Sequence, residues 1–437
     1  MRKTILILCI ACALASCSVD EGKNFTEINE SAIPTEVSID DALKTLESAL
    51  SSLSGDTKSS VWNKTVADIS TLTMSDCFHM TKSSSQEPFD KLLYIVNFEE
   101  GGSAVLGADT RLDPLLVITE ETLITKTDFT QYPQAVPAYT RSDLFCEEDQ
   151  EYYIGNNSTD LPHSVFIMDY LENAVSHAPY DGSDDSDDYA YAFSATDVAM
   201  TYLKTKWHQD DPYNGKIRRS WLSGDRCPAG CTTIALVQML VYNKDIPISK
   251  FSISESTWDD LDRNSIYRIT TSDQEKQEEN DRLVNDVSTL VKSVANGIGV
   301  SYNFLFTGGT FATPAKVMKY MRRIGYSSAD KIDKFSLPTI TNTLTAGKPV
   351  FIAALSPSLS GHAWVIDGYV TQIATHKETG EQKEQLLLHC NWGWGGADDG
   401  YYIPKLFDNP QWLDDPHNVT SGGNGFDSSW WYRIITY

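Results

Sequence analysis

The chain of 437 residues is poor in basic side chains: 35 lysines and arginines stand against 60 aspartates and glutamates, a formal net charge of −25 at pH 7. A nucleic acid, itself a polyanion, would be repelled by such a chain, which argues against nucleic acid as a partner. Beyond its first residues the sequence has no apolar run long enough to span a bilayer. It also lacks an internal repeat and a long low-complexity tract. What remains is globular sequence, 41% apolar and 22% charged, and long enough for two domains.

The first residues follow the pattern of an export signal. A basic start precedes an apolar run, 5–15, which is too short to span a bilayer in a mature protein. The run ends in Leu14-Ala-Ser-Cys17, which resembles the lipobox of bacterial lipoproteins, whose cysteine is acylated. We therefore expect 1–16 to be a lipoprotein signal peptide and Cys17 to be lipidated. The protein would then be exported, held at a membrane or the cell surface only through its lipid anchor, and open to release by processing. The alternative is an ordinary signal with an incidental Cys17.

Cysteine is scarce as well. Three of the eight cysteines lie in the signal region, and the others are Cys77, Cys146, Cys227, Cys231 and Cys390. This set is too small for a disulfide scaffold. An odd number of cysteines in an exported protein leaves at least one thiol free or reactive. Whether Cys77 pairs with Cys146 is left open.

Residues 17–180 are predicted to form one α+β domain. Apolar residues recur at helical spacing over 38–53, and Ser38 is the expected N-cap of that helix. The runs 91–98 and 115–119 are typical of strands.

An aspartate-rich segment, 181–189, follows this domain. It begins Asp181-Gly-Ser-Asp-Asp-Ser-Asp-Asp188 and has the composition of a solvated linker. Its carboxylates suit calcium, but their spacing is not that of an EF-hand. Cys227 and Cys231 have the spacing of half a zinc site, but no second pair of cysteines or histidines follows to complete it. We therefore expect a linker and no metal.

Residues 190–437 are predicted to form a second α+β domain. A helix over 231–242 follows a loop rich in glycine and proline, and an acidic, helix-prone segment comes next. The strand candidates are 350–355, 363–370, 386–390, 401–403 and 431–436. A leading helix followed by several strands is typical of an α+β domain with an antiparallel sheet.

Cys231 lies where the glycine-containing loop ends and the helical periodicity begins. Unpaired N–H groups and the positive end of the helix dipole favour an anion at such a position. A thiol there commonly has a pKa of about 3.5–7.5, which makes it a thiolate at neutral pH. On position alone, a buried structural cysteine is an equally good interpretation.

Two downstream segments change that balance. His362 begins an apolar strand, and Asn391 ends another strand before a turn rich in glycine and tryptophan. The order Cys231, His362, Asn391, with gaps of 131 and 160 residues from the cysteine, is similar to that of papain-type peptidases. In such a site the histidine accepts the thiol proton and later donates it to the leaving amine, while the asparagine amide oxygen fixes the orientation of the ring.

Other residues compete for these roles. His389 lies two residues before Asn391 and would face the same side of a strand, which makes it an alternative base. Cys227 is an alternative thiol, but a proline follows it and it lies outside the predicted helix. Asp367, at an odd spacing from His362, is expected to point to the opposite face and to be structural.

The reaction also needs donors for a tetrahedral oxyanion. The backbone N–H of Cys231 is one. Gln209, in the segment Trp207-His-Gln-Asp-Asp-Pro-Tyr-Asn214, is a second candidate because its amide donates without titrating. From this segment alone, a surface-loop residue is the simpler interpretation.

Together these segments resemble the streptopain family of papain-clan cysteine peptidases. The resemblance is carried, in the right order, by Trp207-His-Gln-x-x-Pro-Tyr-Asn214, Gly230-Cys-x-x-x-Ala235 with Gln238, Gly361-His-Ala-x-Val-Ile-Asp-Gly368 and Asn391-Trp-Gly-Trp-Gly-Gly396. It implies a papain-like fold in 190–437, in which Cys231 is the nucleophile, His362 the base and Gln209 the oxyanion donor. It also implies that Asn391 and Trp392 orient and shield the imidazole, that 17–180 is an inhibitory propeptide, and that no cofactor is needed.

The sequence departs from the family around the substrate. The stretch between Gln209 and the nucleophile is short and contains Ile217-Arg218-Arg219, and Thr232-Thr233 replace small apolar residues. The family's substrate loop corresponds to about 302–310, where Gly308 and Gly309 predict a flexible rim. With Gly361, these glycines are the candidate substrate-binding residues.

The predicted function is that of a secreted or surface-tethered cysteine endopeptidase, made as a zymogen that its own propeptide inhibits. Its partners would be protein or peptide substrates, and whether a dedicated inhibitor protein also binds is left open. Two alternatives remain. One is an acyltransferase built on the same papain-like site, and the other is a non-catalytic surface-binding lipoprotein.

Overall fold

The computed structural model describes residues 36–57, 62–77, 91–109, 112–130, 166–168, 170–171, 191–200, 203–221, 223–304, 309–329, 332–355, 361–376, 382–407 and 431–437. Several predictions lie outside these residues, namely the signal peptide 1–16, Cys17, Cys146, the linker 181–189 and Gly308. In the described part of the chain, every helix is too short or too polar to cross a membrane.

In its described residues, the N-terminal region combines one long helix and several short ones with four antiparallel strands. The long helix, α1 (Ile39–Thr57), follows Ser38, whose Oγ accepts the backbone N–H of Asp41 at 3.2 Å as expected of an N-cap. The other elements are β1 (Val66–Thr73), α2 (Met74–Cys77), β2 (Lys91–Phe98), β3 (Ser103–Gly107), β4 (Leu115–Thr119) and α3 (Lys126–Thr130). The predicted helix and both predicted strands are therefore present.

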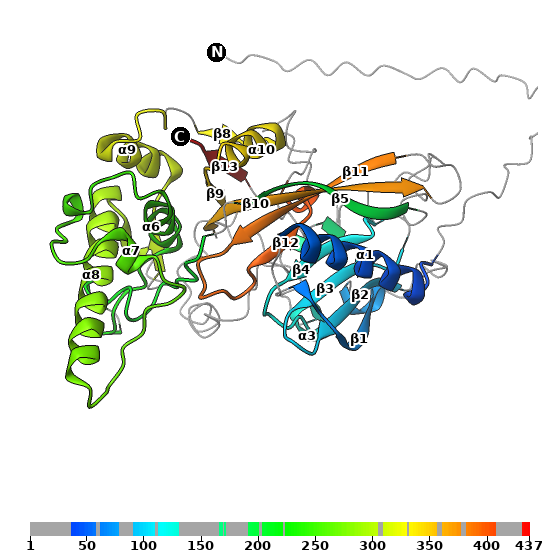
Figure 1. Cartoon of the computed structure of the whole chain (residues 1–437), viewed down its shortest axis with the longest axis horizontal. Helices are drawn as coiled ribbons and strands as arrows, with labels where there is room; N and C mark the ends of the chain where they lie inside the picture. The colour runs from blue at the N-terminus through cyan, green and yellow to red at the C-terminus, as the bar shows by residue number, and fades with distance from the viewer. Residues whose placement is uncertain are drawn as a thin grey trace, which may run out of the picture. The chain divides into compact units, whose positions relative to one another are not determined.

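The C-terminal region opens with β5 (Tyr191–Met200) and then has most of its helices before most of its strands. The helices are α6 (Cys231–Asn243), η4 (Ile248–Phe251), α7 (Trp258–Leu261), α8 (Gln274–Ile298), α9 (Pro314–Ile324), α10 (Leu337–Thr345) and η5 (Pro404–Leu406). The strands are β6 (Ser301–Phe304), β7 (Gly309–Phe311), β8 (Asp333–Lys334), β9 (Val350–Leu355), β10 (Gly361–His376), β11 (Gln382–Asn391), β12 (Gly400–Tyr402) and β13 (Trp431–Ile435). Figure 1 shows α6, α7 and α8 gathered together, in agreement with their mutual contacts.

One antiparallel sheet runs through both regions. Its strand order is β1-β2-β3-β4-β12-β11-β10-β9-β13-β8, and β5 pairs with β10 outside this path. The regions are joined where β12 pairs with β4, with Tyr401 opposite Ile118. β6 and β7 form a separate two-stranded sheet. The α+β class with an antiparallel sheet is confirmed, and the two predicted domains share that sheet.

The strand β10 is longer than its apolar pattern predicted. The expected strand ended at Val370, whereas β10 continues to His376. Its second half pairs with β11 on one side and with β5 on the other. Backbone hydrogen bonds on both edges extend the strand through residues that are no longer continuously apolar. β5 itself was not predicted.

Alternating side chains of β10 pack into two different apolar clusters. Ala363 and Val365 face the cluster formed with α6 and α8, whereas Trp364 and Ile366 face the cluster that contains the N-terminal strands. The helix α6 is almost entirely buried between its neighbours. This packing fixes the start of α6 and the start of β10, the two points where the nucleophile and the base were predicted.

Candidate active site

Cys231 is the first residue of α6. It follows Gly230, whose φ of 90° lies in a region that side chains with a Cβ rarely adopt. A Cβ on Gly230 would also lie 2.7 Å from Cγ2 of Thr310. Only glycine can therefore make this turn, which delivers the thiol to the helix N-terminus with its own backbone N–H unpaired by the helix.

The surroundings of Cys231 favour its thiolate. Burial raises the pKa of this thiol, but the charge of His362 and a hydrogen bond with its imidazole lower it, as do bonds from the Ala363 backbone and the Thr232 side chain. The net shift is downward. Among the described cysteines this is the only lowered pKa, because burial raises that of Cys77, Cys227 and Cys390. This difference separates Cys231 from its rival Cys227.

His362 lies near the start of β10, with Ala354 of β9 opposite it. Its Nε2 is 2.9 Å from the backbone oxygen of Trp392. A carbonyl oxygen only accepts hydrogen bonds, so Nε2 must carry a proton and Nδ1 is the ring nitrogen left for Cys231. This is the tautomer that a base acting on the thiol requires.

Three tryptophan rings enclose the imidazole of His362. The ring centroid of Trp394 lies 4.6 Å from that of His362, and the rings of Trp364 and Trp392 both lie at 6.0 Å. Trp364 and Trp392 are fully buried and stack on each other at 4.6 Å. The aromatic walls exclude water from one side of the base and restrict the rotation of its ring.

Asn391 does not make the bond predicted for it. Its Oδ1 accepts from Nε2 of Gln238 at 2.9 Å and from the backbone N–H of Gly393 at 3.2 Å, and its Nδ2 donates to the oxygen of Thr205 at 2.9 Å. The orienting position beside His362 is taken instead by the main-chain oxygen of Trp392. Because the Asn391 amide is buried and these bonds use both its atoms, it acts as a brace between α6 and the end of β11.

Gln238 belongs to the site although its place in the motif around Cys231 predicts no role for it. It is fully buried, donates to Asn391, and its Oε1 accepts the backbone N–H of Trp207 at 3.1 Å. A glutamine inside the otherwise apolar buried stretch 234–241 was the available signal. Gln238 ties the nucleophile helix to the strand end that carries the base's partner and to the segment that carries Gln209.

Gln209 lies next to the nucleophile loop. Its backbone oxygen accepts the N–H of Ala229 at 2.8 Å, two residues before Cys231. The neighbouring Trp207 accepts through its own backbone oxygen from Gly395 at 3.0 Å. The Gln209 side chain is half-buried, so its amide group is available to a ligand at the loop.

His389 makes bonds that leave no place for Cys231. Its Nδ1 is 2.6 Å from Oδ1 of Asp367, and its Nε2 is 3.3 Å from Oε1 of Glu120, a residue of the N-terminal region. Asp367 is buried, and it is the extra residue at a bulge where β10 pairs with β11, because Ile366 pairs with Cys390 and Gly368 with His389. The structural role expected of Asp367 thus has a concrete form as the counter-ion of His389.

The candidate substrate-binding glycines lie in two strands. Gly309 begins β7 and pairs with Phe304 of β6, and Gly361 is exposed at the start of β10, next to His362. Within the described ranges, no group of three or more histidine, cysteine, aspartate or glutamate side chains is arranged to hold a metal ion.

Comparison with known proteins matches the same segment of the chain. The model of the peptidase C10 family matches residues 207–402, which include Gln209, Cys231, His362 and Asn391. No curated protein matches the chain. One similar solved structure is a mutant fragment of prointerpain A from Prevotella intermedia, which is 17% identical, with a match that covers 84% of this chain and 98% of that one at a TM-score of 0.48. Another is the active wild-type interpain A cysteine protease of the same organism, which is 19% identical, with 55% and 97% covered and a TM-score of 0.36.

Proposed function

We propose that this chain, in which the model of the peptidase C10 family matches residues 207–402, is a cysteine endopeptidase made as a self-inhibited precursor, with Cys231 and His362 as its catalytic pair. One observation carries the proposal. Cys231 begins α6 beside His362, and it alone among the described thiols has a lowered pKa. A thiolate beside an imidazolium at a helix N-terminus is an activated nucleophile.

The geometry supports acyl transfer in two stages. The Cys231 thiolate attacks the carbonyl carbon of the scissile peptide, and the carbonyl electrons move onto the oxygen. The backbone N–H of Cys231 and the amide of Gln209 would donate to that oxyanion. Collapse of the adduct expels the amine, which takes the Nδ1 proton of His362, and leaves a thioester.

Water then completes the reaction. It attacks the thioester carbon and gives a proton to Nδ1 of His362, and collapse of the second adduct releases the acid and the thiolate. Throughout, Nε2 keeps its proton and donates it in a hydrogen bond to the oxygen of Trp392, which holds the ring in place. His362 is thus the catalytic base, and the main-chain oxygen of Trp392 positions its ring.

Two contacts support the proposal that the N-terminal region restrains the enzyme before processing. Phe166 of that region is buried against the aromatic cluster behind His362, with its ring 5.8 Å from Trp392 and 5.9 Å from Trp364. Glu120 of the same region meets His389. Release of the N-terminal region would remove both contacts from the neighbourhood of the base.

The test is the Cys231→Ala variant of the full-length precursor. It should neither hydrolyse casein nor process itself, and should stay at full length on a gel, whereas Cys227→Ala should mature normally. A thiol-reactive epoxide should label Cys231 at near-neutral pH and leave Cys227 unlabelled. A Cys231→Ala chain that matures without added protease would refute the proposal.

We also propose that the precursor is exported as a lipoprotein, on the sequence of residues 1–16 and Cys17 alone. In bacteria fed a labelled fatty acid, the full-length protein should take up label and sediment with membranes. Cys17→Ala should abolish both. Label that persists in Cys17→Ala would contradict the proposal.

A further inference from the structure

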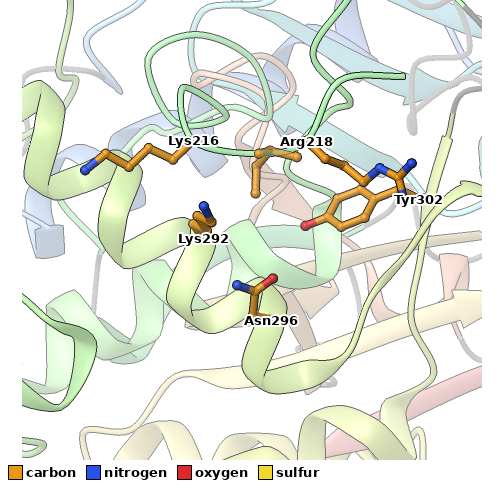
Figure 2. A pocket seen from close by; sticks show the side chains of 6 residues that line it. Lys216, Arg218, Lys292, Asn296 and Tyr302 are labelled. Atoms are coloured by element: carbon orange, nitrogen blue, oxygen red, sulfur yellow. The ribbon is translucent and has the colours of Figure 1, made fainter. Parts of the chain in front are cut away.

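A pocket of about 160 Å³ lies between α8 and the loop that precedes the nucleophile. We call it the basic pocket, and its lining residues are Lys216, Ile217, Arg218, Lys292, Asn296 and Tyr302 (Figure 2). Ile217 is buried, whereas Lys292 and Asn296 project from successive turns of α8 and are exposed. The pocket therefore has a closed floor and a rim open to solvent.

The polar groups of the basic pocket are mostly donors without an acidic partner. Lys216 Nζ donates at 2.6 Å to two neutral oxygens, Oδ1 of Asn285 and Oγ1 of Thr289. None of the ion pairs among the described residues includes Lys216, Arg218 or Lys292. The chain as a whole has 60 acidic and 35 basic residues. The lining of this pocket has the opposite sign of charge, because it contains three cations and no carboxylate.

The same loop carries two further arginines that bond only to main-chain oxygens in the described structure. Arg226 donates to the oxygen of Ile217 at 2.7 Å, and Arg219 donates to that of Gly224 at 2.9 Å. These bonds hold the loop in place, and the two guanidinium groups add positive charge beside the pocket. The mutual repulsion of these cations is relieved when an anion binds between them.

Short backbone links connect the basic pocket to the nucleophile. The N–H of Cys227 donates to the oxygen of Arg218 at 3.0 Å, and Cys227 lies four residues before Cys231. On the other wall, Tyr302 pairs with Thr310 across β6 and β7. Oγ1 of Thr310 donates to the oxygen of Pro228 at 2.8 Å. Both walls of the basic pocket are thus linked to residues 227 and 228, which lie four and three residues before the nucleophile.

We propose that the basic pocket is a substrate subsite for a carboxylate side chain, a glutamate or aspartate a few residues from the scissile bond. This inference rests on the proposed peptidase function. Arginine and lysine around one cavity, with an amide and a phenol as further donors, match an acidic side chain and leave a neutral one without compensation for the like charges. The pocket thereby gives a strongly acidic enzyme a preference for acidic sequence at one position.

The experiment uses the matured enzyme and a peptide set in which a single glutamate is moved through each position on both sides of one cleavage site, with glutamine as the matched neutral residue. At one position glutamate should raise kcat/KM over glutamine by about tenfold, a factor equivalent to about 1.4 kcal/mol. In the double variant Arg218→Gln with Lys292→Gln this ratio should fall close to one. In the control Lys334→Gln, which removes an exposed cation on the edge strand β8, the ratio should stay at its wild-type value.

Two results would overturn the inference. One is an equal rate for glutamate and glutamine at every position, and the other is a double variant that keeps the wild-type ratio. The single variant Lys292→Gln, at an exposed helix position, serves if the double variant fails to fold, and it should lower the ratio in the same direction. Hydrolysis of the all-neutral peptide by the wild-type enzyme reports on the proposed function separately, so that failure of one proposal is not mistaken for failure of the other.

Discussion

The Nε2 atom of His362 lies 2.9 Å from the main-chain oxygen of Trp392. Since that oxygen belongs to the backbone, no side-chain substitution removes it, and the ring keeps its orientation as long as the end of β11 keeps its path. The path is held by Asn391, which bonds to α6 through Gln238 and to the oxygen of Thr205. The path of the strand therefore sets the orientation of the base. Asn391 acts on that orientation indirectly, by holding the end of β11.

Replacing Asn391 should consequently damage stability more than chemistry. Asn391→Ala leaves Nε2 of Gln238 and the oxygen of Thr205 unpaired in a buried place, and each unpaired group costs about 1–3 kcal/mol. We expect a lower Tm by calorimetry and a modest loss of kcat. The pH at half-maximal kcat/KM should stay within experimental error of the wild-type value, whereas a shift of this pH by a full unit would show that the amide acts directly on the imidazole.

Gln238 should be as important to stability as Asn391. Gln238→Leu keeps the size of a buried side chain but leaves the N–H of Trp207 without a partner, which costs about 1–3 kcal/mol, and it removes one of the two donors to Oδ1 of Asn391. We expect urea unfolding to show this loss. Gln274→Leu, at the exposed first turn of the neighbouring helix α8, is the control and should change stability by about 0.5 kcal/mol or less. Equal effects of the two variants would contradict the bracing role of Gln238.

The sequence predicted the elements that depend on local periodicity. The helix α6 and the strand β9 lie where their apolar patterns place them. Burial of one or both faces of an element produces an apolar pattern among residues close together in the sequence. The full length of β10 depends on a partner far away in the chain, and β5, that partner, gave no signal of its own. Local pattern carries no information about which distant strand supplies the hydrogen bonds.

The same limit applies to the site. Proximity of Cys231 and His362 followed from motif order and from the positions of a helix start and a strand start. The partner of His389 did not, since Glu120 is 269 residues away and lies in a region predicted to be a separate domain. The exchange of Asn391 for a main-chain oxygen also depends on atomic geometry, because a residue name says nothing about where a neighbouring carbonyl points.

The lowered pKa of Cys231 predicts how the thiol should respond to pH. Burial alone raises the pKa, and the charge of His362 is the first influence that lowers it. In the wild-type enzyme the thiolate should thus persist below the usual range of a cysteine thiol, and alkylation of Cys231 by iodoacetamide at pH 7 should be faster than that of an ordinary cysteine. In His362→Ala the lowering influence is lost and burial dominates, so that the alkylation rate at that pH should fall by about tenfold or more, given about 1.36 kcal/mol per pKa unit.

A matched background makes this measurement specific. The assay is run in Cys227→Ser, because burial raises the pKa of Cys227 and its residual reaction would otherwise add a slow phase. Mass spectrometry of the modified peptide identifies the labelled thiol. Identical pH profiles for His362→Ala and its parent would show that the helix terminus, and not the imidazole, sets the thiolate population.

Glu120 should contribute most of the electrostatic hold of the N-terminal region on the enzyme. Burial raises the pKa of Glu120, but the lowering effect of His389 and Lys206 is larger, and the resulting pKa is about 2. Burial lowers the pKa of His389, but Asp367 and Glu120 raise it, to about 10. A carboxylate with a depressed pKa contributes stability above its unfolded value of about 4.5, and this stability is lost as the pH falls toward 2. A histidine with a raised pKa contributes fully below about 6.5, and its contribution is lost as the pH rises toward 10.

The precursor should therefore be most stable between about pH 4.5 and 6.5 as far as this pair is concerned. Glu120→Gln in the inactive Cys231→Ala precursor removes one charge from a buried cluster and should cost about 3 kcal/mol, most of it within that pH window. Glu121→Gln is the control, because Glu121 bonds to the same Lys206 at 2.6 Å but its side chain is 66% exposed, and an exposed pair contributes about 0–1 kcal/mol. Thermal unfolding should separate the two variants most at pH 5.5 and less at pH 10.5, where His389 has lost its proton and only Lys206 still pairs with Glu120. If the two losses are equal at pH 5.5, the hold on the enzyme comes from apolar contacts such as that of Phe166 on Trp392, and not from Glu120.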